Sequence, residues 1–360
     1  YEGTFCPKKD GNYTLIIEGD DGYRVYVNGS KVIDYWGEHA SAKREYTLKA
    51  TAGQDYKIKI EYMQAGAEAL LKFDLGIYRQ IPAATVDKVK DADIVIFLGG
   101  ISPDLEGEEK HFVNCPGFSG GDRTSIELPQ VQRDILKALK KAGKKVVFVN
   151  CSGSAVALVP EMESCDAILQ AWYPGQAGGL AVADVLFGDF NPSGKLPVTF
   201  YETLSELPSF EDYSMSGRTY RYMKGKAQYP FGYGLTYGKA EVRSVEVVET
   251  ETGANVFVKV ENTGERDICE VLQIYIKCEN SIYAVPNPQL CGFCRVKLYK
   301  EERKTLQVHI PGEAFTVVDE EGRHIAGGKH YTIYAGFSQP DAKSEELTGM
   351  SPVKVEFRKR

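Results

Sequence analysis

The chain has 360 residues, of which 43% are hydrophobic and 26% are charged, and its formal net charge is −7. This length predicts two or three domains, and the composition is that of an ordinary folded protein rather than a disordered one. The negative charge, without a clustered basic face, argues against a nucleic-acid surface, and no apolar run reaches the roughly eighteen residues that a membrane span needs.

The eight cysteines are scattered and too sparse for a disulfide scaffold. Cys291 and Cys294 form a single C-x-x-C motif without a second pair or a histidine close by, so a strand-borne pair of thiols is favoured over zinc. Position 1 is Tyr rather than Met, and no charged-then-apolar leader follows it. The chain is therefore expected to be a fragment or a processed piece.

Residues 1–78 show an all-β pattern. Segments such as Tyr13–Ile17 and Tyr23–Val27 alternate polar and apolar side chains, and turn sequences at Asp20-Asp21-Gly22 and Asn28-Gly29 separate them. Several short strands at this spacing predict a β-sandwich. The string GNYTLIIEGDDGYRVYVNGSKVIDYW resembles the protective-antigen-type β-sandwich module, which is found inserted in glycosidases and in adhesins. The resemblance implies that the usual opening strand of the module is missing here, so the domain is expected to be incomplete at its N-terminus.

Asp20 and Asp21 have two interpretations. In the adhesin relatives of that module, an Asp pair at this place binds calcium and a sugar, so the resemblance makes calcium one alternative. The other is that both residues serve the turn, because no further oxygen ligands for calcium can be identified in the sequence. The favoured expectation is a chain with no bound metal and no cofactor.

Residues 79–200 change to alternating strands and helices. The continuous apolar run Ile94–Leu98 is typical of a strand covered on both faces, and Gly99-Gly100 ends it. Further strands are predicted at Lys145–Val149, Ala167–Ala171 and Leu196–Phe200. One helix is predicted to begin at Pro129, and a second helix is predicted to span Ala177–Phe187. This order predicts an α/β sandwich with a mainly parallel, helix-covered sheet.

Carboxylates crowd the loop after the first of these strands. Asp104, Glu106, Glu108 and Glu109 follow Ile94–Leu98, at the strand end where ligands gather in α/β sheets. Like charges and burial both favour the protonated form of a carboxyl group, which can then act as a general acid near neutral pH. The alternative is a solvated acidic loop, which spacing alone favours.

Four strings carry a second resemblance: GDRTSIELP (Gly121–Pro129), AWYPGQAGGLAVADVLFGDFNPSGKLPVTFY (Ala171–Tyr201), GRTYRYM (Gly217–Met223) and YPFGYGLTY (Tyr229–Tyr237). They resemble the second domain and the connecting segment of glycoside hydrolase family 3 enzymes, which are exo-acting β-glucosidases, β-xylosidases and relatives. A dinucleotide-binding fold is the rival, but no G-x-G-x-x-G follows a strand. Residues 201–240 would then connect to residues 241–360, whose alternating strands resemble the family's closing fibronectin type III-like β-sandwich.

The family resemblance implies a retaining mechanism, in which two carboxyl groups face one bond about 5 Å apart. In the family, an Asp nucleophile lies on an N-terminal (β/α)8 barrel, and a Glu in a loop of the form E-x-E-G is the acid/base. Glu106-Gly107-Glu108-Glu109 fits this loop with Glu in place of the last Gly. Glu108 is therefore the expected acid/base, Glu109 its rival, and Glu106 the neighbour that favours the protonated acid. Asp122 and Arg123 are expected to form an ion pair that fixes the loop.

A barrel needs about 250 residues, and no stretch of that length remains. We therefore expect the barrel to lie on another chain or upstream of residue 1. We also expect residues 1–360 to be inactive by themselves. The expected whole is a retaining exo-β-glycosidase that removes terminal xylose or glucose from plant-polysaccharide-derived oligosaccharides. A non-catalytic carbohydrate-binding or adhesion protein stays open, as does α-L-arabinofuranosidase or N-acetylglucosaminidase specificity. The expected partners are an oligosaccharide, the barrel and a second copy in a homodimer, and the expected location is periplasmic or secreted, with the cytoplasm left open.

Overall fold

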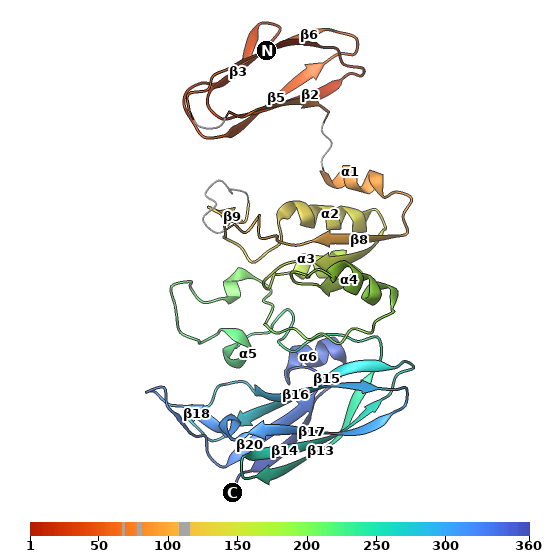
Figure 1. Ribbon diagram of the computed structural model, residues 1–360, viewed down its shortest axis with the longest axis vertical. Coiled ribbons are helices and arrows are strands. Elements are labelled where there is room, and N and C mark those ends of the chain that lie inside the picture. Colours follow the sequence, from red (N-terminus) through yellow and green to blue (C-terminus); the bar gives the residue numbers. More distant parts are fainter. Residues whose placement is uncertain (67–68, 78–80, 108–115) are drawn as a thin grey trace. The chain divides into compact units, whose positions relative to one another are not determined.

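The computed structural model describes residues 1–66, 69–77, 81–107 and 116–360 (Figure 1). The chain divides into two compact units, Tyr1–Lys88 and Val89–Arg360. Glu108 and Glu109 lie outside the described residues. Within these ranges, none of the helices has the length and apolar character that crossing a bilayer requires.

The first unit is a sandwich of two antiparallel sheets, with strand orders β1-β6-β3-β4 and β5-β2-β7. Its elements are β1 (Glu2–Phe5), β2 (Gly11–Gly19), β3 (Tyr23–Val27), β4 (Ser30–Tyr35), β5 (Ala42–Ala50), β6 (Tyr56–Tyr62), β7 (Leu71–Gly76) and α1 (Ile81–Lys88). Alternation turns Leu15 and Ile17 of β2 and Val25 of β3 into the core, which confirms the expected β-sandwich. The sequence pattern did not predict β1, which pairs with β6.

Asp21 holds the β2–β3 turn together. It is buried in the left-handed region at φ +63°, and its carboxylate accepts hydrogen bonds from the backbone N–H groups of His39, Ala65 and Gly66 at 3.1, 2.7 and 3.3 Å. These bonds, that of Ala65 foremost, lower the pKa of Asp21. Among the described residues, no three His, Cys, Asp or Glu side chains gather as a metal site. The carboxylate therefore ties two distant loops to this turn.

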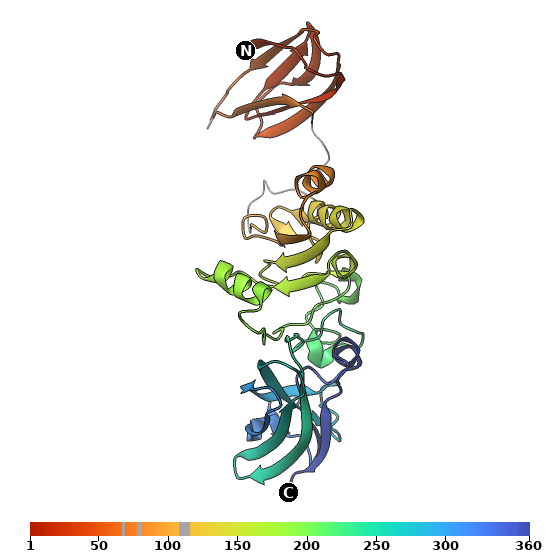
Figure 2. The same ribbon diagram turned by 90° about the vertical axis from the view of Figure 1, so that its right-hand side faces the viewer.

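The second unit begins with a layer of parallel strands in the order β12-β11-β8. Its elements are β8 (Ile94–Gly99), the short strands β9 (Phe118–Ser119) and β10 (Asp122–Arg123), α2 (Gln130–Lys141), β11 (Lys145–Asn150), α3 (Val159–Ser164), β12 (Ala167–Gln170) and α4 (Gly178–Phe187). The amphipathic helix α2 buries Leu136 and Leu139. Helices α2 and α4 lie on opposite sides of the sheet (Figure 2). The mainly parallel α/β layer is confirmed.

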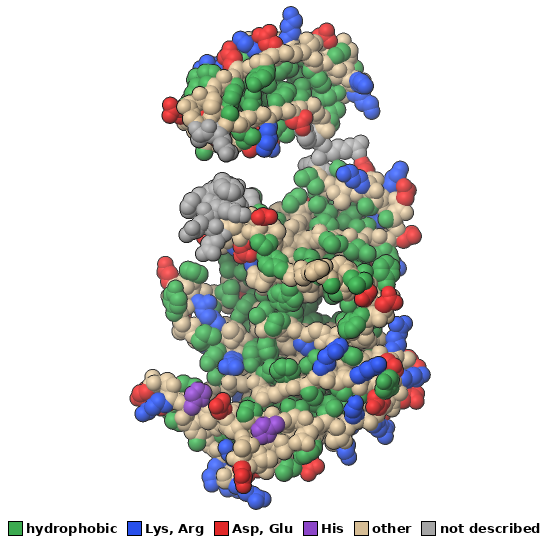
Figure 3. Space-filling view, viewed as in Figure 1, with side chains coloured by type: hydrophobic (Ala, Val, Ile, Leu, Met, Phe, Trp, Pro, Cys, Tyr) green, Lys and Arg blue, Asp and Glu red, His purple; other side chains and the backbone are tan. Residues whose placement is uncertain are grey.

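One face of this sheet is only partly covered, contrary to the expectation from the sequence. Ile94, Ile96 and Leu98 of β8 point to the same face and are 56%, 45% and 67% exposed. Figure 3 shows hydrophobic side chains gathered over this part of the second unit. The continuous apolar run correctly indicated a strand made for burial on both sides. The described residues supply a complete cover for only one side.

The predicted strand Leu196–Phe200 is not a strand of the sheet. Pro197 has no N–H for a ladder, and the segment lies instead against residues 228–233 of the connecting segment. The N–H of Leu196 donates to the Tyr233 carbonyl at 2.9 Å, and that of Phe200 donates to the Tyr229 carbonyl at 3.0 Å. The connecting segment, with η1 (Leu204–Glu206) and α5 (Thr219–Tyr222), therefore folds back onto the α/β layer.

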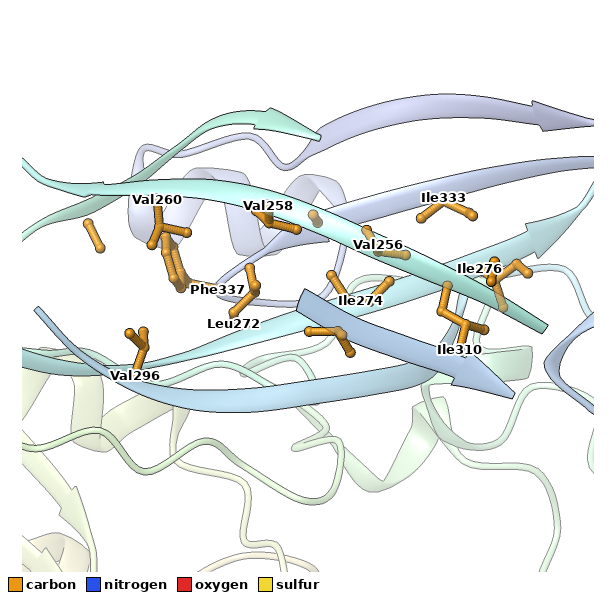
Figure 4. Packing of buried hydrophobic residues seen from close by; sticks show 14 of the residues in the cluster. Val256, Val258, Val260, Leu272, Ile274, Ile276, Val296, Ile310, Ile333 and Phe337 are labelled. Atoms are coloured by element: carbon orange, nitrogen blue, oxygen red, sulfur yellow. The ribbon is translucent and has the colours of Figure 1, made fainter. Parts of the chain in front are cut away.

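The C-terminal part is the expected fibronectin type III-like sandwich. Its two sheets have the orders β13-β14-β17 and β16-β15-β20-β21. Its elements are β13 (Ala240–Thr250), β14 (Gly253–Asn262), β15 (Ile268–Cys278), β16 (Gln289–Leu298), β17 (Arg303–Pro311), η2 (Gly312–Phe315), β18 (Thr316–Val318), β19 (His324–Ala326), β20 (His330–Gly336), α6 (Ala342–Thr348) and β21 (Val353–Arg358). Figure 4 shows Val256 and Val258 of β14 facing Leu272 and Ile274 of β15 across the core.

Cys291 and Cys294 both lie on β16, where they pack against this core. The Cys291 thiol donates to the Ile274 carbonyl at 3.3 Å, and burial raises its pKa to about 12. A thiol that holds its proton this tightly is a poor metal ligand, because metals bind the thiolate.

A buried ion pair joins the α/β layer to the sandwich. The Lys195 ammonium lies 2.8 Å from the Glu270 carboxylate and donates to the Gly234 carbonyl at 2.7 Å. Next to it, Gly232 has φ +75°, and a Cβ there would lie 2.3 Å from the Gln273 side-chain oxygen. The connecting segment is therefore packed directly on β15.

Candidate active site

The loops that follow β8, β11 and β12 are locked together at the carboxyl edge of the sheet. Gly100 has φ +128°, and a Cβ there would lie 2.4 Å from the Cys151 carbonyl oxygen, so only glycine fits. The Ile101 N–H donates to Ser152 Oγ at 3.0 Å, and the Tyr173 hydroxyl donates to the Ile101 carbonyl at 3.0 Å. Trp172, the residue before Tyr173, has a backbone φ of +56°. A strained non-glycine residue of this kind is typical of functional edges.

A buried polar network supports this edge from below. The Ser152 hydroxyl donates to Asn150 Oδ1 at 2.8 Å, and Asn150 Nδ2 donates to Gln170 Oε1 at 2.7 Å. Asn150 and Ser152 are fully buried, so these hydrogen bonds fix the ends of β11 and β12. The sequence pattern did not predict a role for these residues. The available signal was a polar residue that ends each of two otherwise apolar strands.

Arg123 of β10 binds to the same edge. Its Nη1 donates to Ser154 Oγ at 2.7 Å, its Nε donates to the Ser125 carbonyl at 3.2 Å, and Nε lies 3.9 Å from Glu106 Oε1. Burial lowers the pKa of Arg123, while the Glu106 charge opposes that shift. Its Nη2 is buried and has no hydrogen-bond partner among the described residues. The hydrogen bonds of Nη1 and Nε thus fix the guanidinium at this edge.

The expected ion pair between Asp122 and Arg123 is not formed. Neighbouring residues of a strand point to opposite sides, so Asp122 is exposed while Arg123 turns inward to Glu106. Of the predicted acidic residues, Glu106 is placed here, whereas Glu108 and Glu109 fall outside the described part of the chain.

The Glu106–Arg123 contact has a chemical consequence. It places the start and the end of the acidic loop together at the carboxyl edge, where an α/β sheet binds its ligands. It also places a carboxylate and a guanidinium side by side. Such a set can hold hydroxyl groups and can influence the proton of a neighbouring carboxyl group.

Comparison with known proteins identifies the family. Residues 21–237 match the model of the glycosyl hydrolase family 3 C-terminal domain, and residues 270–339 match that of the fibronectin type III-like domain. The chain belongs to glycosyl hydrolase family 3. The resemblance of the four sequence strings is thereby confirmed.

The relatives of this family 3 chain are longer proteins. It is 46% identical over 356 residues to a xylan 1,4-β-xylosidase of Xylanibacter ruminicola, and the match covers 97% of this chain and 40% of that protein. It is 33% identical over 318 residues to a periplasmic β-glucosidase of Salmonella typhimurium, and the match covers 84% of this chain and 40% of that protein. The chain therefore spans about two fifths of the length of these relatives.

Solved structures give the same fold. The crystal structure of the β-glucosidase from Kluyveromyces marxianus in complex with glucose matches with a TM-score of 0.66 at 26% identity, covering 99% of this chain and 44% of that one. A β-glucosidase structure from Bifidobacterium adolescentis matches 77% of this chain with a TM-score of 0.65 at 29% identity.

Proposed function

We propose that this family 3 chain is the C-terminal part of a retaining exo-β-glycosidase. The enzyme removes terminal β-linked xylose or glucose from oligosaccharides derived from plant polysaccharides. The observation that supports the proposal is the Glu106–Arg123 contact at the carboxyl edge of a family 3 parallel sheet. Xylose is favoured because a long and similar relative is named a xylosidase.

Each residue of the loop has a proposed role. Glu108 protonates the leaving oxygen and then activates water, and Glu109 is the rival for this role. Glu106 is the neighbour whose negative charge favours the protonated acid, and Arg123 positions Glu106. The nucleophile is an Asp on a (β/α)8 barrel that this chain does not contain, so the residues present hold one half of the reaction centre.

The proposal is tested with the full-length enzyme on nitrophenyl glycosides. We expect β-D-xyloside or β-D-glucoside to be cleaved faster than α-L-arabinofuranoside or N-acetyl-β-D-glucosaminide. Preference for one of the last two would change the specificity but keep the reaction class. Absence of hydrolysis of all four, in a folded protein that still binds oligosaccharides, would favour the carbohydrate-binding or adhesion alternative.

The open face of the parallel sheet supplies a docking surface for the remainder of the enzyme. The pairing register puts the side chains of Val147 and Leu169 on the same face of the sheet as that of Ile96. Val147 and Leu169 line a cavity together with Val185 and Leu186 of α4. The face is thus covered near β12 and exposed at β8, the strand at the sheet's edge. A parallel sheet is normally buried on both faces. We therefore propose that the part of the enzyme that bears the barrel covers Ile94, Ile96 and Leu98.

A charged residue on this face of the sheet should have different effects in residues 1–360, where the face is open, and in the full-length enzyme, where we propose that it is covered. Ile96→Asp should lower the free energy of unfolding by no more than about 0.5 kcal/mol in residues 1–360, where the site is exposed, and by about 3 kcal/mol or more in the full-length enzyme. Denaturant unfolding of both proteins measures this difference. Val248→Asp on β13, also an exposed position, is the control and should be mild in both. An equally small effect of Ile96→Asp in both proteins would contradict the docking proposal.

Location and assembly also remain proposals. The similarity to a periplasmic β-glucosidase supports a periplasmic or secreted enzyme. A homodimer stays a prediction, which sedimentation of the full-length enzyme would test.

A further inference from the structure

A groove of about 800 Å³ lies between the connecting segment and the fibronectin-like domain. Helix α5 and residues 281–286 form one wall, the β18–β19 hairpin forms the other, and β16 lies at the floor. Figure 1 shows α5 above the fibronectin-like domain and β18 at the left of that domain. A volume of this size is within the range of protein sites for small ligands.

The first wall is held rigidly by hydrogen bonds. Asn287 Nδ2 donates to the carbonyls of Tyr220 and Met223, both at 2.8 Å, and the Leu290 N–H donates to the Tyr220 hydroxyl at 3.1 Å. The Tyr220 ring stacks on Phe231 with ring centroids 4.2 Å apart. Helix α5 is therefore fixed to β16 before any ligand binds.

The second wall is equally well fixed. Asp319 accepts hydrogen bonds from the N–H groups of Glu321 at 3.0 Å and Arg323 at 2.9 Å, which closes the tip of the hairpin. The Thr316 hydroxyl lies 3.0 Å from His324 Nδ1 across the hairpin. A preformed groove avoids much of the ordering cost of binding.

Aromatic side chains line the surface of the groove. Tyr222, Tyr283 and Phe293 line it, and Phe293 is 66% exposed. Gly292 also lines the groove, and a Cβ there would lie 2.7 Å from Cγ1 of the buried Val308, so packing of the core favours glycine at this position. Aromatic rings at an apolar surface suit the C–H faces of sugar rings.

The rim adds hydrogen-bonding groups of both charges. Arg221, Glu313 and Glu320 line the groove, and within the described ranges none of the three is in a salt bridge. Gln289 adds an amide that can both donate and accept. Asp319 also lines the groove, but its charge is paired with Arg323 at 2.8 Å. Charged groups of both signs, with hydrogen-bond donors and acceptors around an apolar floor, suit a neutral ligand rich in hydroxyl groups.

We propose that this groove is an accessory binding site for a neutral β-linked oligosaccharide. It rests on the proposed function, because such chains are the substrates named there. The groove would keep the oligosaccharide on the enzyme between successive cleavages, without taking part in the chemistry.

The test is a titration of isotope-labelled residues 1–360 with xylohexaose and with cellohexaose, followed by amide NMR. We expect shifts at Gln289–Phe293 and in the β18–β19 hairpin. The double variant Tyr283→Ala/Phe293→Ala should weaken binding at least about tenfold, because both ring contacts with the sugar are lost. Tyr299→Ala, an exposed ring of the same domain outside the groove, is the matched control and should bind like the wild type.

The groove proposal is overturned if neither sugar shifts these amides, or if the folded double variant binds as tightly as the wild type. Unchanged thermal unfolding of the variant shows that it is folded. Hydrolysis of nitrophenyl glycosides by the full-length enzyme separates the two proposals. Hydrolysis without binding in the groove rejects the groove alone, whereas binding in the groove without hydrolysis of any glycoside supports the groove and rejects the enzymatic function.

Discussion

Glu108→Gln in the full-length enzyme should slow the hydrolysis of xylobiose by about 10²–10⁴-fold, the usual contribution of a general acid. The leaving sugar oxygen needs a proton, and the amide cannot supply one. A dinitrophenyl xyloside has a leaving group that departs without a proton, so its glycosylation step should slow far less. The basic limb of the pH profile of kcat/KM, which reports the loss of the acid's proton, should disappear.

Glu109→Gln is the matched control for this prediction. It removes a charge at the neighbouring position and should change xylobiose hydrolysis much less. The reverse ranking of the two variants would assign the acid/base role to Glu109. Equal and small effects of both would show that the proton donor lies outside this loop.

Glu270→Ala should lower the free energy of unfolding by about 3–5 kcal/mol, because it leaves the buried Lys195 ammonium without its partner. Both side chains are at most one-tenth exposed. Burial raises the pKa of Glu270, so the folded state holds this proton more tightly than the unfolded state does. The contribution of Glu270 to stability should therefore fall as pH rises from about 4.3 toward the folded pKa. Denaturant unfolding at several pH values measures both effects.

The double variant Lys195→Met/Glu270→Leu tests whether the unpaired Lys195 charge causes the loss of stability. Replacing both partners removes the unpaired charge, so most of the lost stability should return. Glu265→Ala removes the partner of Lys300 in an exposed pair and should cost far less stability than Glu270→Ala. A double variant as unstable as Glu270→Ala would show that packing, and not the lone charge, causes the loss.

Much of the fold followed from local patterns. Alternating strands between turns such as Asn28-Gly29 predicted the first sandwich, and both residues of that turn have positive φ as a tight hairpin requires. The apolar runs of β8 and β11 predicted a parallel sheet, and they pair in parallel. These features depend on neighbours in the sequence, which is why the sequence reveals them.

What the sequence did not reveal depends on distant partners. Leu196–Phe200 reads as a strand, but its hydrogen bonds go to residues near Tyr229 rather than to the sheet. Arg123 turns to Glu106 instead of its neighbour Asp122 because Glu106, seventeen residues earlier in the chain, lies on its side of the strand. The exposed face of β8 reflects partners that the described residues do not include. Tertiary contacts of this kind leave no periodic signal.

Azide rescue of the full-length Glu108→Gln variant tests the central claim most directly. With an activated xyloside as donor, azide should attack the glycosyl-enzyme without base assistance, restore turnover and yield β-xylosyl azide, as expected when the acid/base of a retaining enzyme is removed. An α-xylosyl azide would make Glu108 the nucleophile. No azide product and no rescue would contradict the claim that this chain supplies the acid/base.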